Sequence, residues 1–233
     1  MTDINVSVEN KLVRLLQTLN DCVDQYSELT FSSSLSAEDM IITDVINRNQ
    51  LPITIFTIDT GRLPKETYEL LQLLKVHYQT PIVSYVPDSH DLENYLNEHG
   101  CNAFYQSIDY RKLCCSIRKI GPLKRALKGN NMWVTGLRRE QSITRQDAEI
   151  ISYDPQFQIT KCNPLFDWSQ KEVWSYIKTY DVPYNALHDR GFPSIGCAPC
   201  TRKIEEHEEE RAGRWWWESP ESKECGLHQL VKA

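Results

Sequence analysis

The sequence predicts an α/β fold in which a mostly parallel sheet is flanked by helices. Short apolar segments typical of strands alternate with longer segments of helical periodicity, and this alternation is typical of parallel strands joined by crossover helices. Small polar residues follow the first two predicted strands. The chain has 233 residues, of which 40% are hydrophobic and 25% charged, as expected for one soluble globular domain with, at most, a tail.

We expect the elements in the following order. Leucines at helical spacing predict an opening helix near residues 7–20, and Pro64 near a helix start predicts another through His77. Further helices are expected near residues 40–46, 91–99 and 169–180, whereas residues 101–110 are ambiguous. Strands are expected at residues 29–33, 53–58, 82–86 and 132–135, followed by a hairpin formed by residues 150–153 and 157–160.

Two loops follow predicted strands at the edge where parallel sheets bind ligands. The first, SSLSAED, joins a strand to a helix and suits a phosphate or sulfate, because a helix N-terminus presents N–H groups. An N-capped helix with Ser36 as its cap remains the alternative. The second is the Asp59-Thr60-Gly61 turn. After a later strand, Arg138 and Arg139 lie in a loop whose guanidinium groups suit an oxyanion.

Composition and charge argue against several classes of protein. The net charge of −6 argues against general nucleic-acid binding. No apolar run approaches the length that spans a membrane, and the polar N-terminus lacks the apolar region of a signal peptide. Eight cysteines without an export signal indicate a reducing compartment, so a cytoplasmic location is expected, with metal-binding or catalytic thiols.

Four cysteines form two pairs, the adjacent Cys114 and Cys115 and the C-x-x-C pair Cys197 and Cys200. Four thiolates can hold an iron–sulfur cluster or a structural zinc ion. Adjacent cysteines diverge by roughly 100° on a helix, which suits two corners of a cluster better than two ligands of one ion. Unligated buried thiols remain a third interpretation. Arg118 and Lys119 lie beside the first pair, either as partners of thiolates or as solvated charges.

The end of the chain combines an acidic run at residues 205–210, expected on a solvated helical face, with three consecutive tryptophans and a late cysteine. Trp215–Trp217 must pack on other residues, because three indole rings are costly to expose. Cys225 is followed by Gly226 and His228, which suits a reactive thiol on a tail. An unreactive exposed cysteine is the alternative.

The segments SSSLSAEDM, TIDTGRLPKETY, CCSIRKIGPL, TGLRREQSITR, GCAPCTR, GRWWWE and KECGLH resemble the assimilatory adenylyl-sulfate (APS) reductases, in their bacterial, thioredoxin-dependent iron–sulfur form. The matching segments span the chain from about Ser32 to His228. The resemblance implies a fold like that of the adenine-nucleotide α-hydrolases, which is Rossmann-like. It also implies a domain at residues 1–204 that carries the cluster, and a C-terminal lid tail at 205–233 that carries the catalytic cysteine.

The same resemblance implies a reaction. The thiolate of Cys225 attacks the sulfur of APS, AMP leaves, and an S-sulfocysteine remains on the enzyme. Thioredoxin or glutaredoxin then frees sulfite, as a step of sulfate assimilation toward cysteine. No nucleic-acid or membrane partner is expected, and a homo-oligomer is possible.

Residue roles follow from the resemblance. Cys114, Cys115, Cys197 and Cys200 would hold a [4Fe–4S] cluster, and Lys119 would lie between cluster and substrate. Cys225 and His228 would complete the catalytic set. The expected substrate-binding residues are Ser32, Ser33, Ser34, Thr60, Gly61, Arg138, Arg139, Arg211 and Arg214. One departure is visible: many relatives carry a histidine shortly before the cysteine pair, where this chain has Tyr110, Arg111 and Lys112.

Three other functions compete with APS reduction. A 3′-phosphoadenylyl-sulfate (PAPS) reductase, or dual activity, is disfavoured because such proteins typically lack the two cysteine pairs. A tRNA sulfurtransferase of the ATP-pyrophosphatase type usually displays S-G-G-x-D-S in the first loop and needs a basic surface. A zinc-stapled binding module would leave Cys225 and the arginine loop unexplained.

Overall fold

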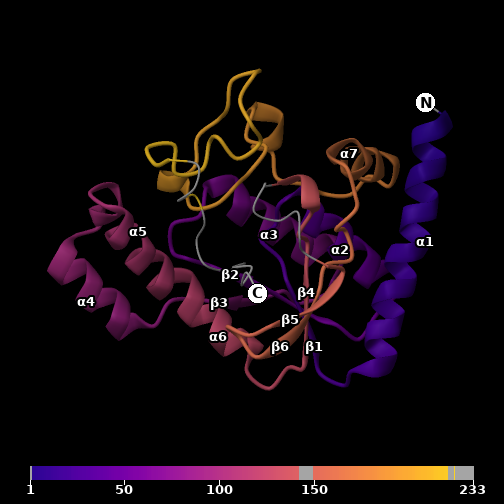
Figure 1. Cartoon of the computed structure of the whole chain (residues 1–233), viewed down its shortest axis with the longest axis horizontal. Coiled ribbons are helices and arrows are strands. Elements are labelled where there is room, and N and C mark those ends of the chain that lie inside the picture. Colours follow the sequence, from indigo (N-terminus) through magenta and orange to yellow (C-terminus); the bar gives the residue numbers. More distant parts are fainter. Residues whose placement is uncertain (1, 142–148, 220–222, 224–233) are drawn as a thin grey trace. The chain divides into compact units, whose positions relative to one another are not determined.

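The computed structural model describes residues 2–141, 149–219 and 223, with the side chains of residues 2–5 excepted (Figure 1). Its contacts divide the chain into two compact units. The first unit comprises Met1–Thr57, Glu66–Val83 and Gly129–Ala186, and the second comprises Ile58–Lys65, Ser84–Lys128 and Leu187–Ala233. The division expected between residues 204 and 205 concerns the role of the tail and stays a prediction.

The predicted α/β fold with a mostly parallel sheet is confirmed. The strands are β1 (Leu29–Ser32), β2 (Thr54–Ile58), β3 (Val83–Tyr85), β4 (Met132–Thr135), β5 (Ile151–Asp154) and β6 (Ile159–Cys162). Their order is β3-β2-β1-β4-β6-β5. β1 pairs in parallel with β2 and β4, and β4 pairs in parallel with β6. β5 pairs antiparallel with β6 and forms the expected hairpin.

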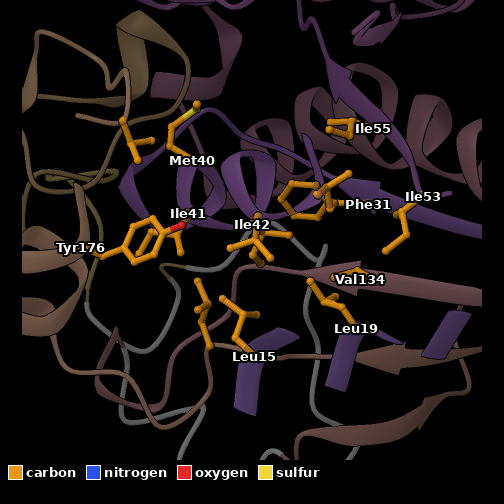
Figure 2. Packing of buried hydrophobic residues seen from close by; sticks show 14 of the residues in the cluster. Leu15, Leu19, Phe31, Met40, Ile41, Ile42, Ile53, Ile55, Val134 and Tyr176 are labelled. Carbon is orange, nitrogen blue, oxygen red and sulfur yellow. The ribbon is translucent and has the colours of Figure 1, made fainter. Parts of the chain in front are cut away.

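The helices of the first unit cover its sheet and enclose the main core. They are α1 (Thr2–Gln25), α2 (Ala37–Arg48), α3 (Lys65–His77) and α7 (Gln170–Thr179). Figure 2 shows Leu15 and Leu19 from α1, Ile41 and Ile42 from α2 and Phe31 from β1 in one buried cluster. Burying such side chains is the main favourable contribution to folding.

α1 and α2 are longer than predicted. α1 continues on both sides of residues 7–20 because Ser7 and Lys11 bind Glu172 at the start of α7, which the leucine pattern does not encode. α2 begins at Ala37 rather than at residue 40, because acidic residues favour the first turn of a helix and Glu38 and Asp39 occupy it.

The second unit contains α4 (Ser89–His99), α5 (Ile108–Cys115) and α6 (Gly121–Leu127). Between α5 and α6 the chain forms a π-helix, Ser116–Ile120. The ambiguous residues 101–110 form a 3-10 turn, Ala103–Tyr105, and the start of α5, which Ser107 caps through the backbone N–H of Tyr110. A smaller apolar cluster joins Phe104, Tyr95 and Trp215 to the four paired cysteines.

One expectation for the end of the chain is corrected and another is confirmed. The acidic run at residues 205–210 forms turns instead of a helix, because the Glu208 carboxylate accepts from the Arg202 guanidinium and from the backbone N–H of Glu205. The three tryptophans pack on other residues as expected: Trp215 is fully buried, Trp217 contacts Tyr105, and Trp216 contacts Trp217 although it is 40% exposed. No helix in the described ranges is both long and apolar enough to cross a membrane.

Candidate functional site

The order of the strands reverses between β1 and β4, at the centre of the sheet in the first unit. From β1 the chain continues to β2 and β3 on one side, and β4 then pairs with β1 on the other side. Ser32 and Thr135, the last residues of these strands, lie opposite each other. The serine loop (residues 32–36) and the arginine loop (residues 136–141) therefore both leave from the position at which open α/β sheets bind ligands.

The three predicted serines have different surroundings. The Ser32 hydroxyl accepts from the indole N–H of Trp133 at 2.8 Å. Ser33 is buried, and its hydroxyl accepts from the backbone N–H of Leu35. Ser34 is exposed, and its hydroxyl lies 2.8 Å from that of Ser36. Ser36 precedes α2 as expected, but its side chain makes no capping hydrogen bond.

Asp39 holds the serine loop. One oxygen of its carboxylate accepts both the backbone N–H and the hydroxyl of Ser34, each at 2.6 Å, and the backbone N–H of Gly136 also donates to it. A Cβ at Gly136 would overlap the carboxylate, so this position requires glycine. Burial raises the pKa of Asp39 to about 7, although the hydrogen bonds from Ser34 and Gly136 act in the opposite direction.

The loop also contains a strained residue. Leu35 has φ of 61°, in the left-handed region that residues with a Cβ seldom adopt. It is buried among the core residues, which hold it in place. Left-handed residues in such loops orient successive N–H groups toward a common point and cluster at functional sites.

The arginine loop separates two neighbouring guanidinium groups. Arg138 is fully buried and binds Glu38 through Nε and Nη2, each at 2.8 Å. Arg139 is exposed and stacks on Phe166 with 4.7 Å between the guanidinium carbon and the ring centre. Arg138 therefore ties the loop to α2, whereas Arg139 presents its charge at the surface.

The second unit contains a cavity that brings all four paired cysteines together. It is lined by Arg62, Phe104, Arg111, Cys114, Cys115, Arg118, Lys119, Cys197, Pro199, Cys200 and Trp215. All four thiols are buried and none forms a disulfide. The lining is almost entirely sulfur, aromatic carbon and cationic side chains, so it suits a group that carries negative charge.

The helix around the first cysteine pair places cations beside the sulfurs. Arg111 lies one helical turn before Cys115, and Arg118 lies four residues after Cys114 in the π-helix. Arg111 is hydrogen-bonded to the sulfur of Cys115. Burial raises the pKa of Cys114, and the positive charge of Arg118 opposes this rise. Short π-helical segments occur frequently at functional sites, where they redirect side chains.

The second cysteine pair has its own polar neighbours. The hydroxyl of Thr60 lies 3.2 Å from the sulfur of Cys197. Burial raises the pKa of Cys197, but Lys119, Thr60 and Arg214 outweigh it and hold that pKa below its ordinary value. Burial and the neighbouring Cys197 instead raise the pKa of Cys200 to about 11, opposed by Lys119 and Arg214.

Thr60 and Gly61, which we expected in a nucleotide-binding turn, lie beside this cavity. The carbonyl oxygen of Thr60 accepts from Arg118 at 2.6 Å. Gly61 has φ of 70°, and a Cβ there would lie 3.5 Å from the guanidinium of Arg118. The turn therefore positions a neighbour of the thiols, and its nucleotide contact stays a prediction.

Trp215 forms a platform for cations at the cavity. The guanidinium carbons of Arg214 and Arg111 lie 4.8 and 4.9 Å from the centre of its ring, and the ammonium nitrogen of Lys119 lies 5.8 Å from it. Its indole N–H is buried without a hydrogen-bond partner among the described residues. Arg214 packs so closely on Gly196 that a Cβ there would overlap its guanidinium. By contrast, Arg211 is partly exposed, and its guanidinium donates to the carbonyl oxygen of Lys223.

These features fit an iron–sulfur cluster. Hydrogen bonds to cluster sulfurs and nearby charge are the means by which proteins stabilise such groups, and the buried indole N–H of Trp215 offers one more donor. In the described part of the chain, no three His, Cys, Asp or Glu side chains are arranged to hold one metal ion. The four thiols thus line a cavity without forming an ion-sized site.

The remaining predicted residues divide into two groups. Cys225 and His228 lie outside the described residues. Cys22, Cys101 and Cys162 belong to none of the matching segments, so packing in the core is the expected role of all three. Cys22 and Cys162 are buried, in agreement with this expectation, whereas Cys101 is exposed, so the expectation is wrong for Cys101.

The sequence pattern assigned no role to Arg111, which is hydrogen-bonded to the sulfur of Cys115, or to Tyr95, which packs in the apolar cluster that contains the four cysteines. The spacing of four residues between Arg111 and Cys115 was the available signal, because residues at i and i+4 share a helix face.

The raised pKa of Asp39 predicts a pH-dependent stability. Its contribution is fully present below the unfolded pKa near 3.8 and is lost as the pH rises through about 7. Asp39→Asn cannot ionise, so the free energy of unfolding of the variant relative to wild type should increase as the pH rises from 3.8 to about 7, by up to about 4 kcal/mol in all. Urea unfolding at several pH values measures this difference. A difference that does not vary with pH would show that Asp39 is ionised throughout.

Comparison with known proteins identifies the family. Residues 28–203 match the phosphoadenosine phosphosulfate reductase domain. The adenosine 5′-phosphosulfate reductase of Allochromatium vinosum is 50% identical, over 92% of this chain and 84% of the relative. The protein of that name from Burkholderia cepacia is 47% identical, over 97% of this chain and 91% of the relative.

Solved structures agree with this assignment. The phosphoadenylyl-sulfate (PAPS) reductase of Candida auris, in a phosphate complex, has a TM-score of 0.70 and 27% identity, over 82% of this chain and 90% of that chain. The FMN adenylyltransferase of Candida glabrata, with a TM-score of 0.60, 15% identity and coverage of 88% and 69% of the two chains, shares the fold. The chain belongs to the phosphoadenosine phosphosulfate reductase family.

Proposed function

We propose that the chain reduces adenosine 5′-phosphosulfate (APS) to sulfite and AMP, in the assimilation of sulfate. The observation that carries this proposal is the buried cavity lined by four cysteines and several cations, in a chain 44–50% identical to relatives named adenosine 5′-phosphosulfate reductase. The two cysteine pairs favour APS over PAPS as the substrate.

The four cavity cysteines would hold a [4Fe–4S] cluster. Two cations lie beside each pair of cysteines. They are Arg111 and Arg118 for Cys114 and Cys115, and Lys119 and Arg214 for Cys197 and Cys200. These cations offset the negative charge that four thiolates bring to a buried position. When bound, the cluster supplies charge and shape to the site and passes no electrons to the substrate.

The serine loop and Arg139 would bind the nucleotide phosphate. Ser34 and Arg139 are the exposed members of their loops, and both loops leave the sheet at its ligand-binding edge. The phosphate bound by the related reductase of Candida auris shows that a protein of this fold accepts such an anion. Arg138 would act indirectly, because its charge is already paired with Glu38.

The chemistry requires a nucleophile on the tail, and Cys225 would supply it. Its thiolate attacks the sulfur of APS, an S–S bond forms, and the bond from that sulfur to the phosphate oxygen breaks as AMP takes the electron pair. Lys119, Arg211 and Arg214 would neutralise the anionic oxygens, and His228 would orient the sulfonate or the thiolate. A lid formed by residues 205–233 would exclude water.

An external dithiol completes the cycle. One of its thiolates attacks Sγ of Cys225, and sulfite leaves with the electron pair of the S–S bond. The second thiol then displaces Cys225 and leaves the donor as a disulfide. Thioredoxin or glutaredoxin would supply this dithiol in the cytoplasm. The enzyme would act alone or as a homo-oligomer.

Cys225→Ser should abolish covalent sulfonation without loss of iron. Reduced, anaerobic wild-type protein mixed with APS in the absence of a dithiol should gain the mass of one sulfonate, and peptide mapping should locate it on Cys225. The Ser variant should gain none, because a hydroxyl is a poor nucleophile for sulfur, yet it should still bind AMP. Cys101→Ser, which removes an exposed thiol, should react like wild type.

The outcome separates the candidate functions. A sulfonate formed from PAPS instead of APS would assign the phosphorylated substrate. Wild-type protein that retains its iron and forms no adduct with either compound would contradict the reductase function. Hydrolysis of ATP to pyrophosphate would then favour a sulfurtransferase.

The two neighbouring arginines should respond differently to substitution. Arg139→Gln should weaken AMP binding about tenfold, roughly 1.4 kcal/mol. It should have little effect on stability, because Arg139 is exposed and loses only its stacking on Phe166 within the protein. Arg138→Gln should lower the free energy of unfolding by about 3–5 kcal/mol, because Glu38 is left buried and unpaired. Calorimetric titration and urea unfolding measure the two effects. Normal AMP binding by Arg139→Gln would exclude this contact.

A further inference from the structure

Arg111 takes no part in the chemical steps proposed above, although its charge lies beside a cavity cysteine. It is fully buried and lies on α5, one turn before Cys115. It binds the carboxylate of Glu218 through two parallel hydrogen bonds, from Nε to Oε1 at 2.9 Å and from Nη2 to Oε2 at 2.7 Å. Such paired contacts between guanidinium and carboxylate are among the strongest and most directional in proteins.

Two more contacts fix the guanidinium. Its central carbon lies 4.9 Å from the ring centre of Trp215, and the group is hydrogen-bonded to the sulfur of Cys115. Arg111 thus contacts a cluster thiol on one side and the Trp215–Glu218 segment on the other. Because Glu218 is only 3% exposed in its side chain, neither charge of the pair can be satisfied by water if the other is removed.

The position of Glu218 in the sequence gives the pair its significance. The backbone N–H of Glu218 donates to the carbonyl oxygen of Trp215, so the segment ends in a closed turn. Cys225 follows Glu218 by seven residues. Glu218, which Arg111 binds, therefore lies in the sequence between Trp215, which lines the cavity, and Cys225.

We propose that Arg111 is a positioning residue which, through Glu218, fixes the start of the nucleophile-bearing segment to the helix that carries Cys114 and Cys115. The assignment rests on the roles proposed above for Cys225 and for the cluster. It predicts that the ion pair governs how fast Cys225 reacts and leaves nucleotide binding unchanged. It also predicts that Arg111 affects the cluster directly, because Arg111 is hydrogen-bonded to the sulfur of Cys115.

Glu218→Gln and Arg111→Lys test the pair in the holoenzyme. Glutamine keeps the size of Glu218 but lacks the charge, and lysine keeps the charge of Arg111 but lacks the planar fork. Three quantities are measured: the visible absorption and reduction potential of the cluster, the dissociation constant of AMP, and the single-turnover rate of sulfonation of Cys225 by APS. Glu172→Gln is the matched control, because it removes the charge from a different ion pair, Lys11–Glu172, which lies in the first unit.

Glu218→Gln should slow sulfonation at least tenfold, with AMP affinity within twofold of wild type and an unchanged cluster spectrum. Arg111→Lys should slow sulfonation and also shift the reduction potential. The double variant should be no slower than the slower single variant, because the residues act as one unit. Glu172→Gln should match wild type in all three quantities.

Two results would overturn the proposal. Sulfonation at the wild-type rate in Glu218→Gln would show that the pair does not position Cys225. Loss of AMP binding together with loss of iron in that variant would show that the pair serves only general stability. Wild-type protein that forms no adduct would instead contradict the reductase function, so the two failures are distinguishable.

Discussion

The second unit depends on one electrostatic constraint: four buried thiols must be compensated by nearby cations. Burial alone raises the pKa of Cys114 and of Cys200, so these sulfurs are unfavourable sites for negative charge without help. Arg118 and Lys119 supply that help from the π-helix, and Arg214 supplies it from the chain next to Trp215. The four thiols, Arg118 and Lys119 line one cavity, and Arg214 packs on its lining residue Trp215. This arrangement is favourable when an anionic group fills the cavity.

The first unit presents a different set of groups, the serine loop and the arginine loop, where β1 and β4 end. Its serine loop is held in a strained shape by Asp39 and by the buried position of Leu35. Such strain persists only where the surrounding structure enforces it, and here the core beneath α2 and β1 does so. The pairing of Arg138 with Glu38 then fixes the neighbouring loop and leaves Arg139 exposed. Folding thus determines which donor is available to a ligand.

Much of this organisation could be predicted from the sequence, because strands and ligand loops leave local signals. β1 and β4 were placed to within one residue, since an apolar run ends at a small or polar residue in each. The association of the two cysteine pairs follows from their types and spacing. Arg111 was missed because its partner Glu218 lies more than a hundred residues away, and no local pattern reports such a contact. The sequence also could not separate the roles of Arg138 and Arg139. They differ in burial and in the distant partner Glu38 of Arg138, and neither is visible in a local pattern.

The central claim is that the cavity of Cys114, Cys115, Cys197 and Cys200 holds an iron–sulfur cluster. Analysis of iron, acid-labile sulfide and zinc in anaerobically purified protein tests it most directly. The account predicts iron and sulfide in equal amounts, about four of each per chain, and their loss when Cys114 or Cys197 is replaced by serine. Zinc at about one ion per chain, without iron or sulfide, would contradict this claim and would indicate a structural zinc site instead of a cluster.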